Sequence, residues 1–262
     1  MGRSTAVRAW FAVLVTAWLV LAGCGAPAGH PPAPSGTSTA SAPPALRPSA
    51  EPPGGPPAHV LVVIFENKAF EQVDGAERAP YLDELASRSA VYTDLHAITH
   101  PSQPNYLALF SGSTQGVTDD HCPVRLHGRP NLARQLIDAG RTFAGYSEGL
   151  PRAGYTGCSS GAGYAAKHNP WVDFDNVPAT ANQPASAMPV DYALLPTVAF
   201  LVPSLCDDMH DCPVGIGDAW AKRYLDPYAT WAAAHDSLLV VTFDEDDGHH
   251  GNRIFTLLSG AG

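Results

Sequence analysis

Basic residues are scarce in this 262-residue chain, which carries 15 lysines and arginines against 25 aspartates and glutamates. The formal net charge is −10 at pH 7. A nucleic-acid-binding protein needs a basic stripe to neutralise phosphates, and the sequence has none, so we exclude nucleic acid as a partner. A small phosphorylated substrate stays possible, since a bound metal ion would invert the local field.

The sequence also lacks an apolar stretch long enough to span a membrane comfortably. Residues 9–21 are apolar but short, and Arg3 and Arg8 precede them, which is typical of a signal peptide. The stretch ends in Leu-Ala-Gly before Cys24, and this sequence resembles the bacterial lipobox, whose cysteine is lipidated. We therefore expect a lipoprotein signal peptide over residues 1–24, and an exported cell-envelope protein anchored at Cys24. An ordinary signal peptide with an incidental cysteine is the alternative.

Large apolar residues are almost absent from residues 25–57, which consist mainly of Pro, Ala, Ser, Gly and Thr. Such a segment cannot bury a core, so we expect a disordered tether between the membrane and the folded part. The remaining residues, 58–262, are numerous enough for one α/β domain with a sizeable core.

Cysteines are few, and no Cys-x-x-Cys spacing occurs. Apart from Cys24 there are four: Cys122, Cys158, Cys206 and Cys212. An even number in an exported chain favours disulfides over a cysteine-based metal site. Three pairings are possible; we favour Cys206 with Cys212, which closes a short loop, and Cys122 with Cys158, which closes a longer one.

Two acidic clusters are present, each directly after an apolar run. Residues 59–65 precede Glu66 and Asn67, and residues 237–243 precede an Asp-Glu-Asp-Asp sequence at 244–247. Runs of this kind are typical of buried parallel strands, whose carboxyl ends meet at the ligand-binding edge of a sheet. Crowded carboxylates there predict a divalent metal ion between them. Loop acids that cap helices or face water are the alternative.

The rest of the domain alternates between strand and helix patterns, which predicts an α/β fold with a mostly parallel central sheet and helices on both faces. We expect a helix after Ser102 and a long excursion over the sheet edge at 149–189. Asp218 is expected to cap the long helix. Further strands are expected at 90–95, 142–147, 197–202 and 253–258, and further helices at 79–88, 131–139 and 217–235.

Ser102 is the candidate nucleophile. It lies just before Pro104, a residue favoured in the first helical turn. At a helix N-terminus the dipole weakly acidifies a hydroxyl, and free N–H groups can hold a phosphate. The alternative is that Ser102 only caps the helix.

Several separated motifs occur in one order and carry a resemblance. They are Glu-Asn at 66–67, His-Pro-Ser-Gln-Pro-Asn-Tyr at 100–106, Lys-His-Asn-Pro at 167–170, Asp-Asp-Met-His at 207–210 with Gly-Asp-Ala-Trp at 217–220, and Thr-Phe-Asp-Glu-Asp-Asp-Gly at 242–248. The chain from about residue 58 onward resembles the phosphoesterase family of bacterial phospholipases C and acid phosphatases. That family is similar in fold to the alkaline phosphatase and sulfatase superfamily.

The resemblance implies a role for each matching residue. One divalent metal ion would be held by Glu66, Asn67, Ser102, Asp244 and Glu245. Asp246 is an alternative to either of the last two, because the register of an acidic run is ambiguous. Ser102 would take the phosphoryl group. His168 and His210 would lie near the phosphate, one protonating the leaving group and the other contacting the phosphate.

These expectations describe an exported metal-dependent hydrolase of phosphate esters, an acid phosphatase or a phospholipase C-like phosphodiesterase, working through a phospho-serine intermediate. Its substrate would be a small phosphorylated molecule or a phospholipid headgroup. Relatives continue with a further helix of His-Tyr-Ser-Leu type, so we expect a C-terminally short member. The alternative is a catalytically impaired, truncated member that acts as a ligand-binding surface lipoprotein.

Overall fold

A computed structural model of the chain describes residues 55–260. The predicted signal peptide with Cys24, and the predicted tether up to residue 54, lie outside these described residues. Across residues 55–260, every helix is too short or too polar to cross a lipid bilayer.

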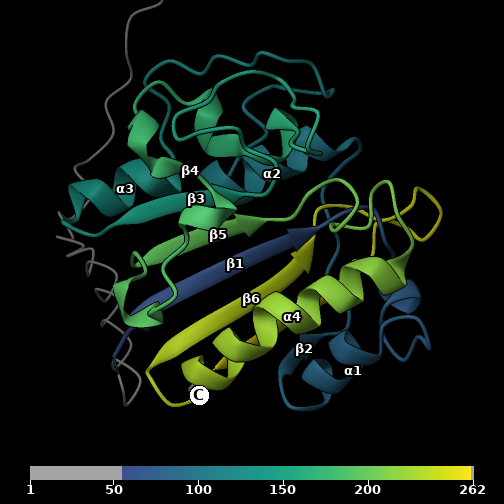
Figure 1. Cartoon of the computed structure of the whole chain (residues 1–262). Helices are drawn as coiled ribbons and strands as arrows, with labels where there is room; N and C mark the ends of the chain where they lie inside the picture. The colour runs from purple at the N-terminus through teal and green to yellow at the C-terminus, as the bar shows by residue number, and fades with distance from the viewer. Residues whose placement is uncertain (1–54, 261–262) are drawn as a thin grey trace, which may run out of the picture. The chain divides into compact units, whose positions relative to one another are not determined.

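A seven-stranded sheet organises the described residues, in the order β2-β7-β6-β1-β5-β3-β4 (Figure 1). Strands β6, β1, β5, β3 and β4 run parallel, whereas β7 is antiparallel to both of its neighbours. The predicted mostly parallel sheet is therefore confirmed, with an antiparallel exception near one edge. The strands are β1 (His59–Phe65), β2 (Ala90–Tyr92), β3 (Phe143–Ser147), β4 (Asn182–Pro184), β5 (Val198–Val202), β6 (Ser237–Phe243) and β7 (Thr256–Gly260).

Helices cover both faces of this sheet, as predicted (Figure 1). Leu61 and Val63 of β1 lie in one apolar cluster with residues of α1 and α4, and Val62 and Ile64 lie in a second cluster with residues of α2 and α3. Alternate side chains of a strand point to opposite faces, so a continuous apolar run is what a strand buried on both sides requires. The helices are α1 (Pro80–Ser87), α2 (Ser102–Ser111), α3 (Leu132–Asp138) and α4 (Val214–Ala232).

Three strands differ from the prediction. Strand β2 ends at Tyr92 rather than at residue 95. Strand β7 begins at Thr256 rather than 253, because Arg253 and Ile254 instead form isolated bridges with His96 and Ala69. Strand β4 falls inside the segment predicted as an irregular excursion, where its sequence is polar. Buried Asn182 explains it: its side chain accepts a hydrogen bond from the indole of Trp171 (2.9 Å) and donates one to a backbone carbonyl.

The prediction for Asp218 was wrong. Helix α4 begins at Val214, so Asp218 lies inside it rather than at its start. Its carboxylate accepts the backbone N–H groups of Tyr81 (3.1 Å) and Leu82 (2.9 Å), at the beginning of α1. Asp218 thus caps the neighbouring helix and joins α1 to α4.

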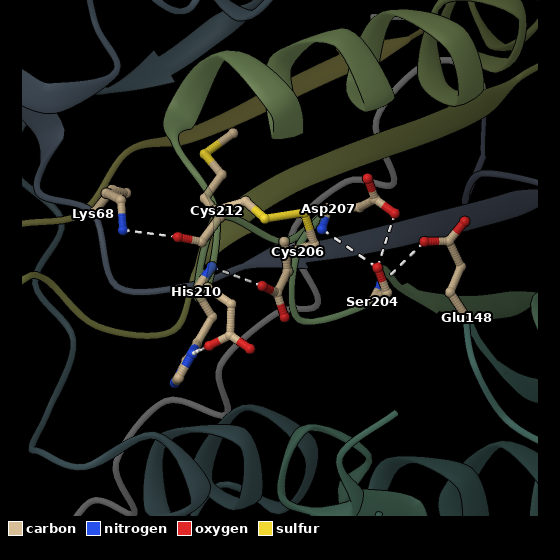
Figure 2. The surroundings of a disulfide bond; sticks show 10 residues. Lys68, Glu148, Ser204, Cys206, Asp207, His210 and Cys212 are labelled. Carbon is tan, nitrogen blue, oxygen red and sulfur yellow. Dashed lines mark hydrogen bonds and ion pairs between the residues drawn. A yellow bond between two sulfur atoms is a disulfide. The ribbon is translucent and has the colours of Figure 1, made fainter. Parts of the chain in front are cut away.

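The structure contains two disulfides, Cys122–Cys158 and Cys206–Cys212, in the arrangement favoured from the sequence. The second closes a seven-residue loop that follows β5 and precedes α4 (Figure 2).

Candidate active site

The ends of β1 and β6 bring the two acidic clusters together. These strands are parallel neighbours, with Phe65 paired to Phe243, so Glu66 and Asp244 follow at the same level. The backbone N–H of Asn67 points at Asp244 Oδ1 (3.4 Å), and its side-chain amide donates to Glu245 Oε1 (3.0 Å). The predicted meeting of both clusters at one edge of the sheet is confirmed.

Ser102 lies between these carboxylates. Its hydroxyl donates towards Glu66 Oε2 (3.1 Å) and Glu245 Oε1 (3.3 Å). Ser102 is the first residue of α2, preceded by Pro101 at the cap position, and its side chain caps no N–H group. The alternative role as a helix cap is therefore contradicted, and the hydroxyl faces the acidic cluster instead.

The beginning of α2 is less open to an anion than the sequence suggests. The N–H of Gln103 is not free, because it donates to Asp120 Oδ1 (2.9 Å). The other oxygen of Asp120 pairs with Lys167 (2.9 Å). An internal carboxylate and a lysine thus occupy part of the site that a phosphate was expected to use.

The electrostatics of this cluster are unfavourable without a counter-ion. Burial, together with Asp244 and Asp208, raises the pKa of Glu66 well above its ordinary value. Burial and Glu245 raise the pKa of Asp244 to about 8, and burial raises that of Asp208 to about 7. Buried carboxylates that repel one another are stabilised either by protonation or by a bound cation.

The residues present fit a divalent ion. Asn67 Oδ1 and Asp244 Oδ2 are buried and have no hydrogen-bond partner, which leaves two oxygens next to the Ser102 hydroxyl group and its carboxylate partners. Carboxylate, amide and hydroxyl oxygens suit a hard divalent cation. Asp246 fits less well, because its oxygens accept backbone N–H groups of the following loop, from Gly248, His250 and Asn252.

The two predicted histidines lie next to each other but in different surroundings. His168 is buried, 1% exposed, and its ring stacks on Tyr106 with the centroids 5.1 Å apart. His210 keeps 31% of its side chain exposed, and its Nδ1 lies 2.7 Å from Asp211. The rings are 6.0 Å apart. His210 is thus the more accessible of the two.

Three further residues of the site have no role in the sequence prediction. Tyr106 donates a hydrogen bond to Glu66 Oε1, His100 Nδ1 lies 2.8 Å from Glu245 Oε2, and buried Asp208 adjoins His168. The sequence contained an indication for two of them. Tyr106 follows Ser102 by one helical turn, which places both side chains on one face of the helix, and Asp208 belongs to the same motif as His210. The prediction of residue roles nevertheless passed over them.

The loop that carries Asp208 and His210 is tied to the end of β1. Lys68 donates to the carbonyl of Met209 (2.9 Å), and the N–H of Glu66 donates to the carbonyl of Asp208 (2.8 Å). Figure 2 shows this loop with the Cys206–Cys212 bridge across its base. The bridge and these bonds hold the loop against the carboxylate cluster.

The chain belongs to the phosphoesterase family, which matches residues 75–254. A phosphatidylinositol-3-phosphatase of Mycobacterium tuberculosis is 49% identical over 206 residues, which cover 78% of this chain and 69% of that protein. The phosphate-repressible acid phosphatase of Penicillium chrysogenum is 32% identical over 216 residues, covering 76% of this chain and 50% of that protein. The chain thus spans about half the length of this fungal relative.

Solved structures support the fold alone. An alkaline phosphatase superfamily protein from Vibrio parahaemolyticus has a TM-score of 0.52 at 14% identity, over 79% of this chain and 60% of that one. The periplasmic domain of EcEptC from Escherichia coli, solved in complex with Zn, has a TM-score of 0.52 at 12% identity, over 79% and 74% of the two chains.

Proposed function

We propose that the protein is a metal-dependent phosphoesterase that works through Ser102 and a phospho-serine intermediate. One observation carries the proposal: the Ser102 hydroxyl lies within 3.3 Å of carboxylates from two neighbouring strand ends. Glu66, Asn67, Ser102, Asp244 and Glu245 would hold one divalent ion. Such an ion would polarise a phosphoryl oxygen and lower the pKa of the Ser102 hydroxyl.

Two residues of the chain carry out the proton transfers: Glu66 accepts a proton and His210 donates one. Ser102 Oγ attacks phosphorus while its proton passes to Glu66 Oε2, the nearest acceptor. The bond between phosphorus and the leaving oxygen breaks, and His210, the more accessible histidine, gives that oxygen a proton. Water then attacks phosphorus and gives one proton back to His210, the bond to Ser102 Oγ breaks, and the proton held by Glu66 returns to the serine. Burial of His168 disfavours direct contact of this residue with substrate.

The substrate that we propose is a phosphate monoester. The 49% identical relative is named for phosphatidylinositol 3-phosphate, so a phosphoinositide headgroup is the first compound to test. A phospholipase C-like diesterase is the competing possibility. Release of inorganic phosphate from phosphatidylinositol 3-phosphate, compared with hydrolysis of bis-p-nitrophenyl phosphate at equal concentration, separates the two.

We also propose that the protein is exported and anchored at Cys24. The apolar segment at 9–21 with the lipobox-like ending supports this, as do the two disulfides, which persist in oxidising compartments. Replacement of Cys24 by alanine should move the protein from the membrane fraction to the soluble extracytoplasmic fraction. An unchanged distribution would contradict the anchor.

The Ser102→Ala variant tests the nucleophile. Hydrolysis of p-nitrophenyl phosphate should be lost, and acid quenching with a ³²P-labelled substrate should trap a labelled chain only in the wild type. Ser111→Ala, at the other end of the same helix, is the matched control. If Ser102→Ala kept wild-type turnover, the nucleophile assignment would be wrong. If the wild type were inactive with every divalent ion, a ligand-binding lipoprotein would be favoured.

A further inference from the structure

A cleft of about 600 Å³ lies beside the active-site loop, at the ends of β3 and β5. Leu201 and Trp220, which line it, belong to the apolar cluster on the α1 and α4 side of the sheet. The helix that begins at Ser102 packs into the cluster on the other side. The cleft is therefore separate from the proposed catalytic site, and its volume falls in the range of small-molecule sites.

Much of the cleft wall is apolar. Trp220 and Tyr224 lie one turn apart on α4, with their ring centroids 4.9 Å apart. Met188, Val190 and Tyr192 line the cleft from the segment that follows β4. Val190 is 97% exposed, so an apolar surface is open to solvent here. An alkyl chain bound in the cleft would remove part of this surface from water.

Two carboxylates lie together in the same cleft. Glu148 Oε2 accepts the backbone N–H of Ser204 (3.0 Å), and Asp207 Oδ2 accepts the hydroxyl of the same serine (2.8 Å) (Figure 2). Glu148 Oε1 accepts the indole N–H of Trp220 (2.9 Å). These donors are neutral, and none of the described residues that line the cleft is Lys, Arg or His. Burial, and to a smaller extent Asp207, raises the pKa of Glu148, as expected for a carboxylate without a compensating cation.

We propose that this cleft binds a small molecule that carries a primary ammonium group on an alkyl chain. The ammonium group would donate hydrogen bonds to Glu148 and Asp207, because a carboxylate can accept more hydrogen bonds than either of these receives. The alkyl chain would lie against the apolar wall. The competing interpretation is structural: Glu148 only joins β3 to the loop after β5 and to α4. The inference concerns a ligand site and is independent of the proposed phosphate-ester hydrolysis.

Isothermal titration calorimetry with hexylammonium chloride tests the proposal. Hexan-1-ol, a neutral molecule of the same chain length, is the matched probe. We expect saturable binding of hexylammonium, at least about tenfold tighter than that of hexan-1-ol, because the alcohol lacks the charge. Glu148→Gln and Asp207→Asn should each weaken hexylammonium binding about 10- to 100-fold, the effect of losing a hydrogen bond to a charged group.

Two control variants locate the binding. Asp191→Asn removes an exposed carboxylate from the segment that follows β4, outside the cleft lining, and should leave the Kd for hexylammonium within about twofold. Asp244→Asn removes charge from the proposed catalytic cluster, which could also attract a cation, and should leave this Kd equally unchanged. Circular dichroism checks folding, and Asp207→Asn decides the test if Glu148→Gln unfolds.

Three results would overturn the proposal. They are hexylammonium binding no tighter than hexan-1-ol binding, an unchanged Kd in either folded variant of Glu148 or Asp207, and loss of binding in Asp244→Asn. The comparison of the two probes uses the unaltered chain, so it holds whether or not a variant folds. Binding is measured without turnover, so the cleft and the proposed enzyme can fail separately.

Discussion

The active site has two sides that are built differently. Glu66 and Asp244 come from the ends of adjacent strands, where ladder hydrogen bonds on both sides fix the backbone. Asp208 and His210 come from a loop that a disulfide and a few hydrogen bonds hold in place. We infer that the sheet fixes the positions of the carboxylates on the strand side. The positions of the side chains on the loop side depend on the disulfide that closes the loop.

Asp244→Asn should have the largest effect, because it removes charge from the strand side without changing shape. We expect kcat/KM for p-nitrophenyl phosphate to fall about 10²- to 10³-fold, the range given by several kcal/mol of lost transition-state stabilisation. Asp247→Asn, in the same acidic run but outside the cluster, should stay within about twofold. An equal loss of kcat/KM in the two variants would contradict the assignment of Asp244, and not Asp247, to the carboxylate cluster.

Removal of each disulfide tests the loop side. The bridges join residues 36 and 6 apart in sequence, so loop entropy predicts losses of about 4 and about 2 kcal/mol of unfolding free energy for the serine double variants. The order should reverse for activity: loss of Cys206–Cys212 should lower kcat/KM about 10- to 100-fold, because it frees the loop that carries Asp208 and His210. Urea titrations and steady-state kinetics measure the two effects. If the variant without Cys122–Cys158 lost more unfolding free energy and also more kcat/KM, the Cys206–Cys212 bridge would have no special role in positioning the loop.

The ion-free protein should lose stability as pH rises. The pKa values of Asp244 and Asp208 are raised to about 8 and about 7, so these two carboxyl groups hold more protons in the folded state than in the unfolded state between about pH 4 and pH 8. The stability contributed by these protonated groups is complete below pH 4 and is lost as pH rises through 7 to 8. Thermal melts with chelator from pH 5 to 8 should show this decline, and a saturating divalent ion should reduce it. A melting temperature that rises with pH in the chelated protein would contradict these assignments.

Asp218→Ala should have the smallest effect on function, since it lies in neither side of the site. Loss of the cap at the start of α1 should cost about 1 kcal/mol of unfolding free energy and leave kcat/KM unchanged. Denaturant unfolding and kinetics on the same preparation provide the check. A large drop in activity would mean that the contact between α1 and α4 also positions the site.

Local patterns in the sequence predicted most of the fold and the centre of the site. The apolar runs before Glu66 and Asp244 predicted buried parallel strands, and their common edge followed from parallel pairing. The polar strand β4 was missed because Asn182 is satisfied by the indole of Trp171, which no local pattern records. Asp218 was assigned to the wrong helix for a related reason: its partners, Tyr81 and Leu82, are more than 130 residues away.

By itself, the sequence determined the two strand ends, the helix that begins at Ser102 and the excess of negative charge, because these depend on residues close together in the chain. Only the tertiary structure decided that the Ser102 hydroxyl faces carboxylates rather than capping its helix, and that Glu66 shares its surroundings with His168 and Asp208. Those outcomes depend on which elements lie side by side, and a carboxylate's partners and pKa are set by neighbours in space rather than in sequence.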